Sequence, residues 1–358
     1  MKRHVTLIVL VALALAVLAS CAPAATPTPV VIEKVSTVVV TKEQTVVVEK
    51  PVTGGTEYAI ISPLIHSFFV PGQEGAAQAA QDLGVNYVWL APPEFSFQKQ
   101  LELFESALSY PGIKGVTLIS AQATGAMADA IKKAEAQGVA VALWAGCDEG
   151  DGSKQAAPIC WAGSFYNMGV ECAKRLAKEM GDAGEVVIAM EMIGDANQDA
   201  RRDGFTAEIT KNHPNIKIVD TLTDCDAAGT TRCAETALAA HPNLKGYFGT
   251  GQTSAIGAVS VFPKAGRTDV KVSAADDPAE VIAGIKSGVI TFSYSQIPYA
   301  SGYMSIYVPW KMAQGLKPTQ HWIDLGIVFI DKDNVDTYAN DVKAKTAELM
   351  KTVDAIMK

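Results

Sequence analysis

From residue 56 onward, short apolar segments alternate with helical segments that end at glycine, and this alternation constrains the fold more than any other feature. The first strand is expected at 57–62, followed by a helix over 73–83 that ends at Gly84. Glycine suits the left-handed conformation that closes a helix. Strands and helices that alternate in this way are typical of βαβ units, which build mostly parallel sheets. The sequence therefore predicts an α/β fold.

The alternation runs in two series, which predicts two doubly wound parallel-sheet domains. A length of 358 residues also fits two domains of about 150 residues each. In the first series, the further strands are expected at 85–90, 115–119 and 139–144, and the helices at 98–109 and 124–137. In the second series, the strands are expected at 185–190, 216–222, 246–249, 270–275, 289–295 and near 326–330. Its helices are expected at 166–180, 199–212, 229–240, 253–263, 278–287 and 299–314, before a last helix rich in Lys and Asp.

The first twenty residues have the pattern of a signal peptide. Lys2, Arg3 and His4 precede an apolar run over 5–19 that ends at Leu-Ala-Ser-Cys. The run is shorter than the roughly 18 residues of a spanning helix, so export is favoured over the alternative, a transmembrane anchor. The sequence before Cys21 resembles a bacterial lipobox, which implies that residues 1–20 are removed and Cys21 carries a lipid.

Residues 21–55 are expected to form a spacer. Its first part is rich in proline, which favours an extended chain. Its second part repeats a Thr-Val-Val-Val segment at 37–40 and 45–48. A flexible tether is the favoured interpretation, and pairing of the two repeats with each other or with a neighbour is the alternative.

The cysteines after Cys21 predict two disulfides. The sequence contains no C-x-x-C, and separations of thirteen and eight residues suit loop-closing disulfides better than zinc ligands. Such pairs oxidise readily outside the cytosol. We therefore predict the pairs Cys147–Cys160 and Cys225–Cys233. Cys172 lies at helical spacing among Met and Leu residues and is expected in the core.

Charge and motifs exclude several classes of function. The formal charge is −8 and no basic cluster exists, so nucleic acid is not expected as a partner. The chain contains no G-x-S-x-G, H-E-x-x-H or P-loop motif, so we predict no enzyme activity and no cofactor. The acidic segment 148–151 lacks the ligand spacing of an EF-hand, which favours a solvated loop and no metal.

Several segments resemble those of one family. The loop Ser62-Pro63-Leu64-Ile65-His66-Ser67-Phe68-Phe69 resembles the N-x-F-F loop of ribose-binding-type periplasmic sugar receptors, the type I solute-binding proteins of ABC importers. Over residues 56 to about 330, four further landmarks match in order: Arg201-Arg202-Asp203-Gly204-Phe205, His241-Pro242 before Tyr247-Phe248-Gly249, Ala274-Ala275-Asp276-Asp277, and Gln296-Ile297-Pro298-Tyr299.

The resemblance implies a function and a domain plan. It implies a monomeric receptor outside the membrane that closes on a small sugar or polyol and delivers it to an ABC permease. It implies one domain of residues 56–163 plus 297–325, another of 164–296 plus 326–358, and three hinge crossovers. The alternatives are a sensor that signals to a membrane kinase or receptor, and a receptor for a nucleoside or autoinducer. A transcription regulator is disfavoured, because no helix-turn-helix is present.

The resemblance also implies a set of ligand-binding residues. Phe68 and Phe69 would stack on the sugar, with a place in the core as the alternative. Arg201 would hold two sugar oxygens with its guanidinium fork, while Arg202 is expected to face solvent or pair with Asp203. Asp276 would accept two hydroxyl protons, with a helix N-cap as the alternative, which Asp277 fits better. Gln296 would bind ligand or form a hinge hydrogen bond.

The sequence departs from the family pattern at several positions. His66 stands where the family has asparagine. Asp148, or Glu149 beside it, is expected to reach in where Ala145-Gly146 replaces a charged pair. Gly251-Gln252 replaces Asn-Asp, and Cys225 replaces an aromatic residue. Three aromatic residues are candidates for replacement stacking or for packing: Trp144, Trp161 and Tyr299. Polar groups that read hydroxyls set specificity, so the resemblance does not imply ribose itself.

Overall fold

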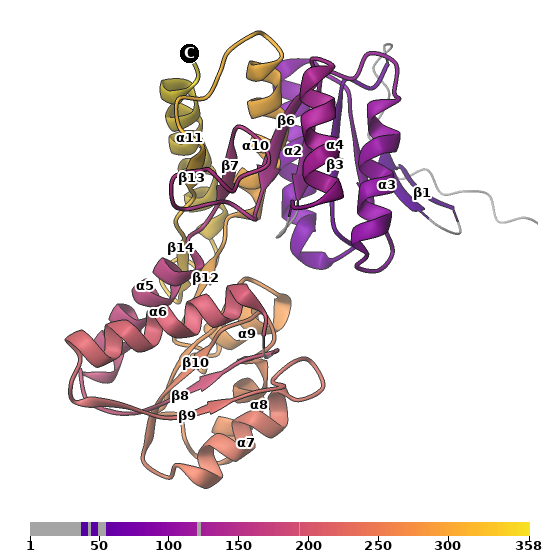
Figure 1. Ribbon diagram of the computed structural model, residues 1–358. Coiled ribbons are helices and arrows are strands. Elements are labelled where there is room, and N and C mark those ends of the chain that lie inside the picture. Colours follow the sequence, from indigo (N-terminus) through magenta and orange to yellow (C-terminus); the bar gives the residue numbers. More distant parts are fainter. Residues whose placement is uncertain (1–36, 42–43, 49–54, 120–122, 193) are drawn as a thin grey trace, which may run out of the picture. The chain divides into compact units, whose positions relative to one another are not determined.

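A computed structural model describes residues 37–41, 44–48, 55–119, 123–192 and 194–358 (Figure 1). The expected signal peptide at 1–20 and the expected lipid attachment at Cys21 lie outside these residues. Within the described part of the chain, no helix is both long enough and apolar enough to cross a membrane. The described elements form two sheets, each covered by helices on both faces.

The first sheet has the strand order β1-β2-β4-β3-β5-β6-β7-β13. Its central strands are parallel, and every residue in them is buried. Their bounds are β3 (Tyr58–Ile61), β4 (Tyr87–Ala91), β5 (Gly115–Ile119) and β6 (Ala140–Trp144), followed by β7 (Cys160–Ala162) and β13 (Trp322–Asp324). One face packs on α2 (Val70–Leu83) and α10 (Pro298–Met312), the other on α3 (Phe97–Leu108) and α4 (Ala126–Ala136). Burial on both faces explains the nearly continuous apolar strands.

The valine repeats form strands. β1 (Thr37–Thr41) pairs antiparallel with β2 (Gln44–Val48), which in turn pairs antiparallel with β4. The expectation of a flexible tether is therefore wrong for these residues. Without the repeats β4 would be an edge strand, and valine has a high β-propensity, so the repeats extend the sheet.

The second sheet has the strand order β14-β12-β11-β10-β8-β9, with only β14 antiparallel to its neighbour. Its strands are β8 (Gly184–Ala189), β9 (Ile216–Leu222), β10 (Leu244–Gly249), β11 (Lys271–Ser273), β12 (Phe292–Ser295) and β14 (Val328–Asp331). One face packs on α5 (Phe165–Met180) and α6 (Ala196–Asn212). The other face packs on α7 (Thr230–Ala240), α8 (Ile256–Lys264) and α9 (Ala279–Lys286).

The last helix, α11 (Tyr338–Ile356), corrects one part of the expected domain plan. Residues 326–358 were assigned to the second domain, and β14 does pair with β12 of the second sheet. The apolar side chains of α11, however, lie in the core of the first sheet beside α10. The apolar spacing of Val342, Leu349 and Val353 predicts a buried stripe but not which sheet it covers.

Both predicted disulfides are present. Cys147 bonds Cys160 and Cys225 bonds Cys233, with Cα atoms 5.4 and 5.8 Å apart. Cys172 is a free, buried cysteine as predicted, and burial raises the pKa of its thiol to about 12. Each disulfide closes a short loop that follows the carboxyl end of a strand, β6 in the first sheet and β9 in the second.

Candidate ligand-binding site

Three of the predicted site residues form one connected network in the second sheet. Arg201 lies on α6, Asp276 follows β11, and Gln296 follows β12. Arg201 Nη2 donates a hydrogen bond to Gln296 Oε1 at 2.7 Å, and Gln296 Nε2 donates to Asp276 Oδ1 at 2.8 Å. Asp276 and Gln296 come from the carboxyl ends of their strands, where open α/β sheets bind ligands.

Arg201 is held by neutral groups. Its side chain is buried, Nη1 donates to the Thr250 carbonyl at 2.7 Å, and the guanidinium carbon lies 4.9 Å from the centre of the Phe165 ring. Its Nε has no hydrogen-bond partner among the described residues. The carboxylate of Asp276 is reached only through Gln296. The guanidinium therefore carries a positive charge that no residue in the described part of the chain neutralises by a direct ion pair.

Asp276 is a buried carboxyl in a special backbone conformation. It is 6 % exposed and has a φ of 59°, where side chains other than glycine are uncommon. Burial raises the pKa of Asp276 to about 6, against the opposing effects of Arg201 and Gln296. The N-cap alternative is wrong for Asp276 and also for Asp277. Pro278 is the N-cap of α9 without any side-chain bond, and Asp277 accepts from the Tyr338 hydroxyl at 2.8 Å.

The predicted aromatic pair is divided between the core and a cavity. Phe69 is 8 % exposed and packs edge-on against Trp144 and near Trp89, so it belongs to the core. Phe68 contacts Phe69 edge-on at 5.2 Å between ring centres and lines a cavity. His66 is exposed, and its Nδ1 accepts from the Phe68 amide at 3.1 Å, which caps the short helix η1 (Ser67–Phe69). Trp144 and Trp161 are buried in the same core, whereas Tyr299 is only partly buried.

The cavity beside Phe68 has a volume of about 540 Å³, which suits a small ligand. It is lined by η1, the start of α2, the loop after β10, the segment that enters α9, and the first residues of α10 and α11. Asp277, Glu280, Gln252 and Tyr338 supply polar groups to its wall, and none of the described residues that line it is a lysine or an arginine.

Asp148 is engaged within its own loop. Its two carboxylate oxygens accept from the amides of Gly150 at 3.0 Å and Lys154 at 3.2 Å, and these bonds lower the pKa of Asp148. The neighbouring Glu149 accepts from the hydroxyl of Ser164 at 3.0 Å, where α5 begins. Both acids therefore order the loop that the Cys147–Cys160 disulfide closes.

Comparison with known proteins decides the family. Residues 58–317 match the family described as periplasmic binding protein domain. The chain belongs to this family of periplasmic binding proteins. The D-allose-binding periplasmic protein of Escherichia coli is 30 % identical to this chain over 252 residues. The alignment covers 68 % of this chain and 79 % of the relative.

Solved structures agree with this assignment. An ABC transporter solute-binding protein from Burkholderia graminis, in complex with D-arabinose, aligns with a TM-score of 0.68 and 27 % identity. The alignment covers 79 % of this chain and 97 % of that one. XylFII, solved in a complex with LytSN, aligns with a TM-score of 0.60 and 26 % identity, covering 78 % of this chain and 99 % of that one.

The receptor is therefore a ribose-type sugar-binding protein of ABC importers with the type I periplasmic binding protein fold, as the resemblance implied. Membership of the family implies an extracytoplasmic location. The relatives are binding proteins of transport systems and not enzymes.

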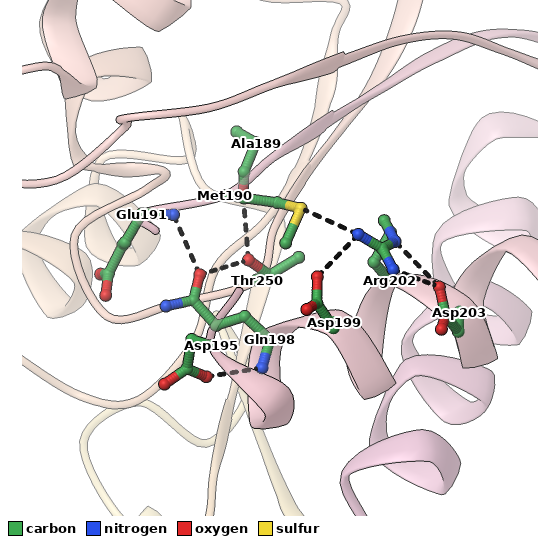
Figure 2. Close-up of polar contacts among 9 residues, drawn as sticks. All are labelled: Ala189, Met190, Glu191, Asp195, Gln198, Asp199, Arg202, Asp203 and Thr250. Carbon is green, nitrogen blue, oxygen red and sulfur yellow. Dashed lines mark hydrogen bonds and ion pairs between the residues drawn. The ribbon is translucent and has the colours of Figure 1, made fainter. Parts of the chain in front are cut away.

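Three residues that hydrogen bonds connect to the network were not predicted from the sequence: Glu191, Gln198 and Thr250. Gln198 Oε1 accepts from the Glu191 amide and from Thr250 Oγ1, both at 2.9 Å (Figure 2). Asp195 caps α6 and accepts from the Gln198 amide at 2.8 Å, so Asp195 marks the start of the helix but gives no signal for the contacts that the Gln198 side chain makes. Figure 2 also shows Arg202 bound to Asp199 and Asp203, as expected for a residue outside the network.

Proposed function

We propose that the protein is a lipid-anchored solute-binding subunit of an ABC importer, which closes on a small sugar or polyol and delivers it to a membrane permease. The network of Arg201, Gln296 and Asp276 carries this proposal. A sugar presents hydroxyl groups that both donate and accept, and a guanidinium linked through an amide to a carboxylate offers donors and acceptors to match them. The lipid anchor at Cys21 and a monomeric state are parts of the same proposal.

The position of Gln296 supports closure as the mechanism. Gln296 lies where the chain leaves β12 of the second sheet for α10, which packs on the first sheet. The chain also crosses between the sheets at 163–164 and 325–327. A ligand that contacts Gln296 and groups on both sheets stabilises the closed state selectively, and only such differential affinity shifts the equilibrium.

A panel of ligands tests the proposal. We expect a pentose or hexose, from a set with D-allose, D-arabinose, D-apiose and D-ribose, to raise the midpoint of thermal unfolding. A ligand at 100 times its Kd stabilises the folded state by about 2.7 kcal/mol. Nucleosides and autoinducer-like furanoses serve as controls. A shift with those compounds alone would contradict the sugar assignment, and no shift at all would favour a receptor that acts through a protein partner.

The affinity for sugar should depend on pH through Asp276. The carboxylate form accepts hydroxyl protons, and the pKa of Asp276 is raised by burial to about 6. Calorimetry should therefore show an affinity about tenfold lower at pH 5 than at pH 7.5, since only about a tenth of the carboxyl groups are ionised at pH 5. Asp276→Asn should remove this dependence. If the affinity of that variant still fell tenfold between pH 7.5 and pH 5, another group would be responsible for the titration.

The same carboxyl should make the unliganded protein less stable as pH rises, whereas it makes sugar binding tighter. In the unfolded chain Asp276 ionises near pH 4, whereas in the folded protein it stays protonated up to about pH 6. The folded state therefore binds the additional proton between these values. The contribution of Asp276 to the free energy of unfolding falls as pH rises through this window.

A sensor that signals to a membrane protein is the second candidate function. The solved complex of XylFII with LytSN favours it, because a relative of similar fold there binds another protein. Affinity purification in the presence of the identified sugar distinguishes the two candidates. Recovery of permease subunits supports import, and recovery of a membrane receptor or kinase supports signalling.

A further inference from the structure

Glu191 and Gly251 occupy matching places on neighbouring strands. β8 and β10 are adjacent and parallel, and Ala189 of β8 lies opposite Gly249 of β10. Glu191 and Gly251 each follow two residues later. Both therefore lie at the carboxyl-end edge of the sheet, where Asp276 and Gln296 also lie.

The side chain of Glu191 occupies the space that a side chain at position 251 would fill. A Cβ atom built on Gly251 would lie 2.4 Å from Cδ and 2.5 Å from Oε2 of Glu191. Carbon atoms of real side chains do not approach so closely, so Glu191 can hold this position only because residue 251 has no side chain. The carboxylate thus replaces whatever group residue 251 would otherwise present.

One carboxylate oxygen of Glu191 is hydrogen-bonded to the protein, and the other is available to a ligand. Its Oε1 accepts from the amide of Thr253 and, at 2.8 Å, from the Thr253 hydroxyl. Its amide is held by Gln198, as Figure 2 shows. No residue in the described part of the chain donates a hydrogen bond to Oε2. This oxygen can accept from a ligand without further ordering of the side chain, which lowers the entropic cost of binding.

The charges around Glu191 are mostly negative. Besides burial, repulsion from Asp277 and Glu191 adds to the raised pKa of Asp276. Arg201 is the cation of the network, and the described lining of the cavity that Asp277 borders contains Asp277 and Glu280 but no lysine or arginine. Arg202 is bound to Asp199 and Asp203. An anionic ligand would therefore meet more negative than positive charge.

We propose that Glu191 takes the place of the missing side chain at position 251 and makes the site select uncharged, hydroxyl-rich sugars while it rejects sugar acids and sugar phosphates. A carboxylate can only accept hydrogen bonds, so it suits hydroxyl donors. It repels carboxylates and phosphates, and such repulsion is an effective way to discriminate between similar ligands. The inference rests on the proposed function, because it assigns the ligand class of the same site.

The test compares uncharged sugars with anionic counterparts by calorimetry on the complete protein. The pairs are D-ribose with D-ribose 5-phosphate and D-glucose with D-glucuronate. We expect the uncharged member of at least one pair to bind at least 100-fold more tightly. Glu191→Gln should reduce the ratio of the Kd for the anion to the Kd for the uncharged sugar at least tenfold, because it improves the relative affinity for the anion. Glu185→Gln removes the same charge at the opposite end of β8 and should leave the ratio unchanged.

Gly251→Ala provides a second variant that leaves Glu191 in the chain. The new methyl group would meet the flexible end of Glu191 and displace it, so this variant should reduce the ratio in the same direction. Equal binding of both members of a pair by the wild-type protein would overturn the inference while the proposed function stands. An equal effect of Glu191→Gln on both members, or the same change in Glu185→Gln, would also overturn it. Binding of no sugar at all would overturn the proposed function as well.

Discussion

Replacing Arg201 with alanine should weaken sugar binding by about 1.5 to 3 kcal/mol, the usual contribution of hydrogen bonds to a charged group. This corresponds to about a 10- to 150-fold increase in Kd. The guanidinium connects Thr250 to Gln296 and, through it, to Asp276, so the variant also leaves a buried carboxyl without a nearby cation. Titration calorimetry with the sugar identified in the thermal panel measures the effect.

Arg202→Ala is the matched control, because it removes the same side chain at the next position of α6. Arg202 is engaged by Asp199 and Asp203, and none of these residues belongs to the network. Its loss should change the affinity by less than twofold. Arg201→Lys should give an intermediate affinity, since it retains the charge but loses the planar fork. Wild-type affinity in Arg201→Ala would remove Arg201 from the site.

Most of the fold could be predicted because its elements are encoded locally. The strand expected at 115–119 is β5, the strand expected at 216–222 is β9, and the helix expected at 166–180 differs from α5 by one residue. Apolar runs of strand length and glycine at helix ends are signals that need no knowledge of distant residues.

The errors concern elements whose place depends on distant partners. The valine repeats have a strong strand propensity, but whether they pair depends on the free edge of β4, about 40 residues away in the sequence. The amphipathic pattern of α11 marks a buried stripe that could cover either sheet. Its position beside α10 follows from the packing of the whole first core.

The family resemblance named the residues of the candidate site, and the positions of two of them at strand ends agree with it. Asp276 and Gln296 follow apolar strands, and the ends of parallel strands meet along one edge of a sheet. Phe69 was ambiguous, because an aromatic residue after a strand can turn inward or outward. Glu191 carried no signal of its own. Its proposed role follows from its contact with Gly251, sixty positions later, which only the three-dimensional structure reveals.

Replacing Gly169 with alanine should destabilise the second sheet and its helices by about 1 to 3 kcal/mol, the usual cost of overpacking. A Cβ atom at Gly169 on α5 would lie 2.0 Å from the carbonyl oxygen of Arg201 and 2.8 Å from the amide of Phe205, both on α6. These are backbone atoms, so only a shift of one helix can relieve the contact. Gly204 makes the reciprocal approach, 2.0 Å from the Tyr166 carbonyl.

The sign of the change in stability distinguishes the effect of close helix packing from that of helix propensity. In a helix interior, alanine is favoured over glycine by about 1 kcal/mol, so propensity alone predicts a more stable protein. Close packing instead predicts a lower midpoint of thermal unfolding and, because α6 carries Arg201, a weaker affinity for sugar. Gly284→Ala on α9 is the comparator, since the atoms nearest its Cβ would belong to the side chains of Ile290 and Val259, which can move, so this change should cost less. A Gly169→Ala protein as stable as wild type, with unchanged affinity, would show that the crossing of α5 and α6 does not position Arg201.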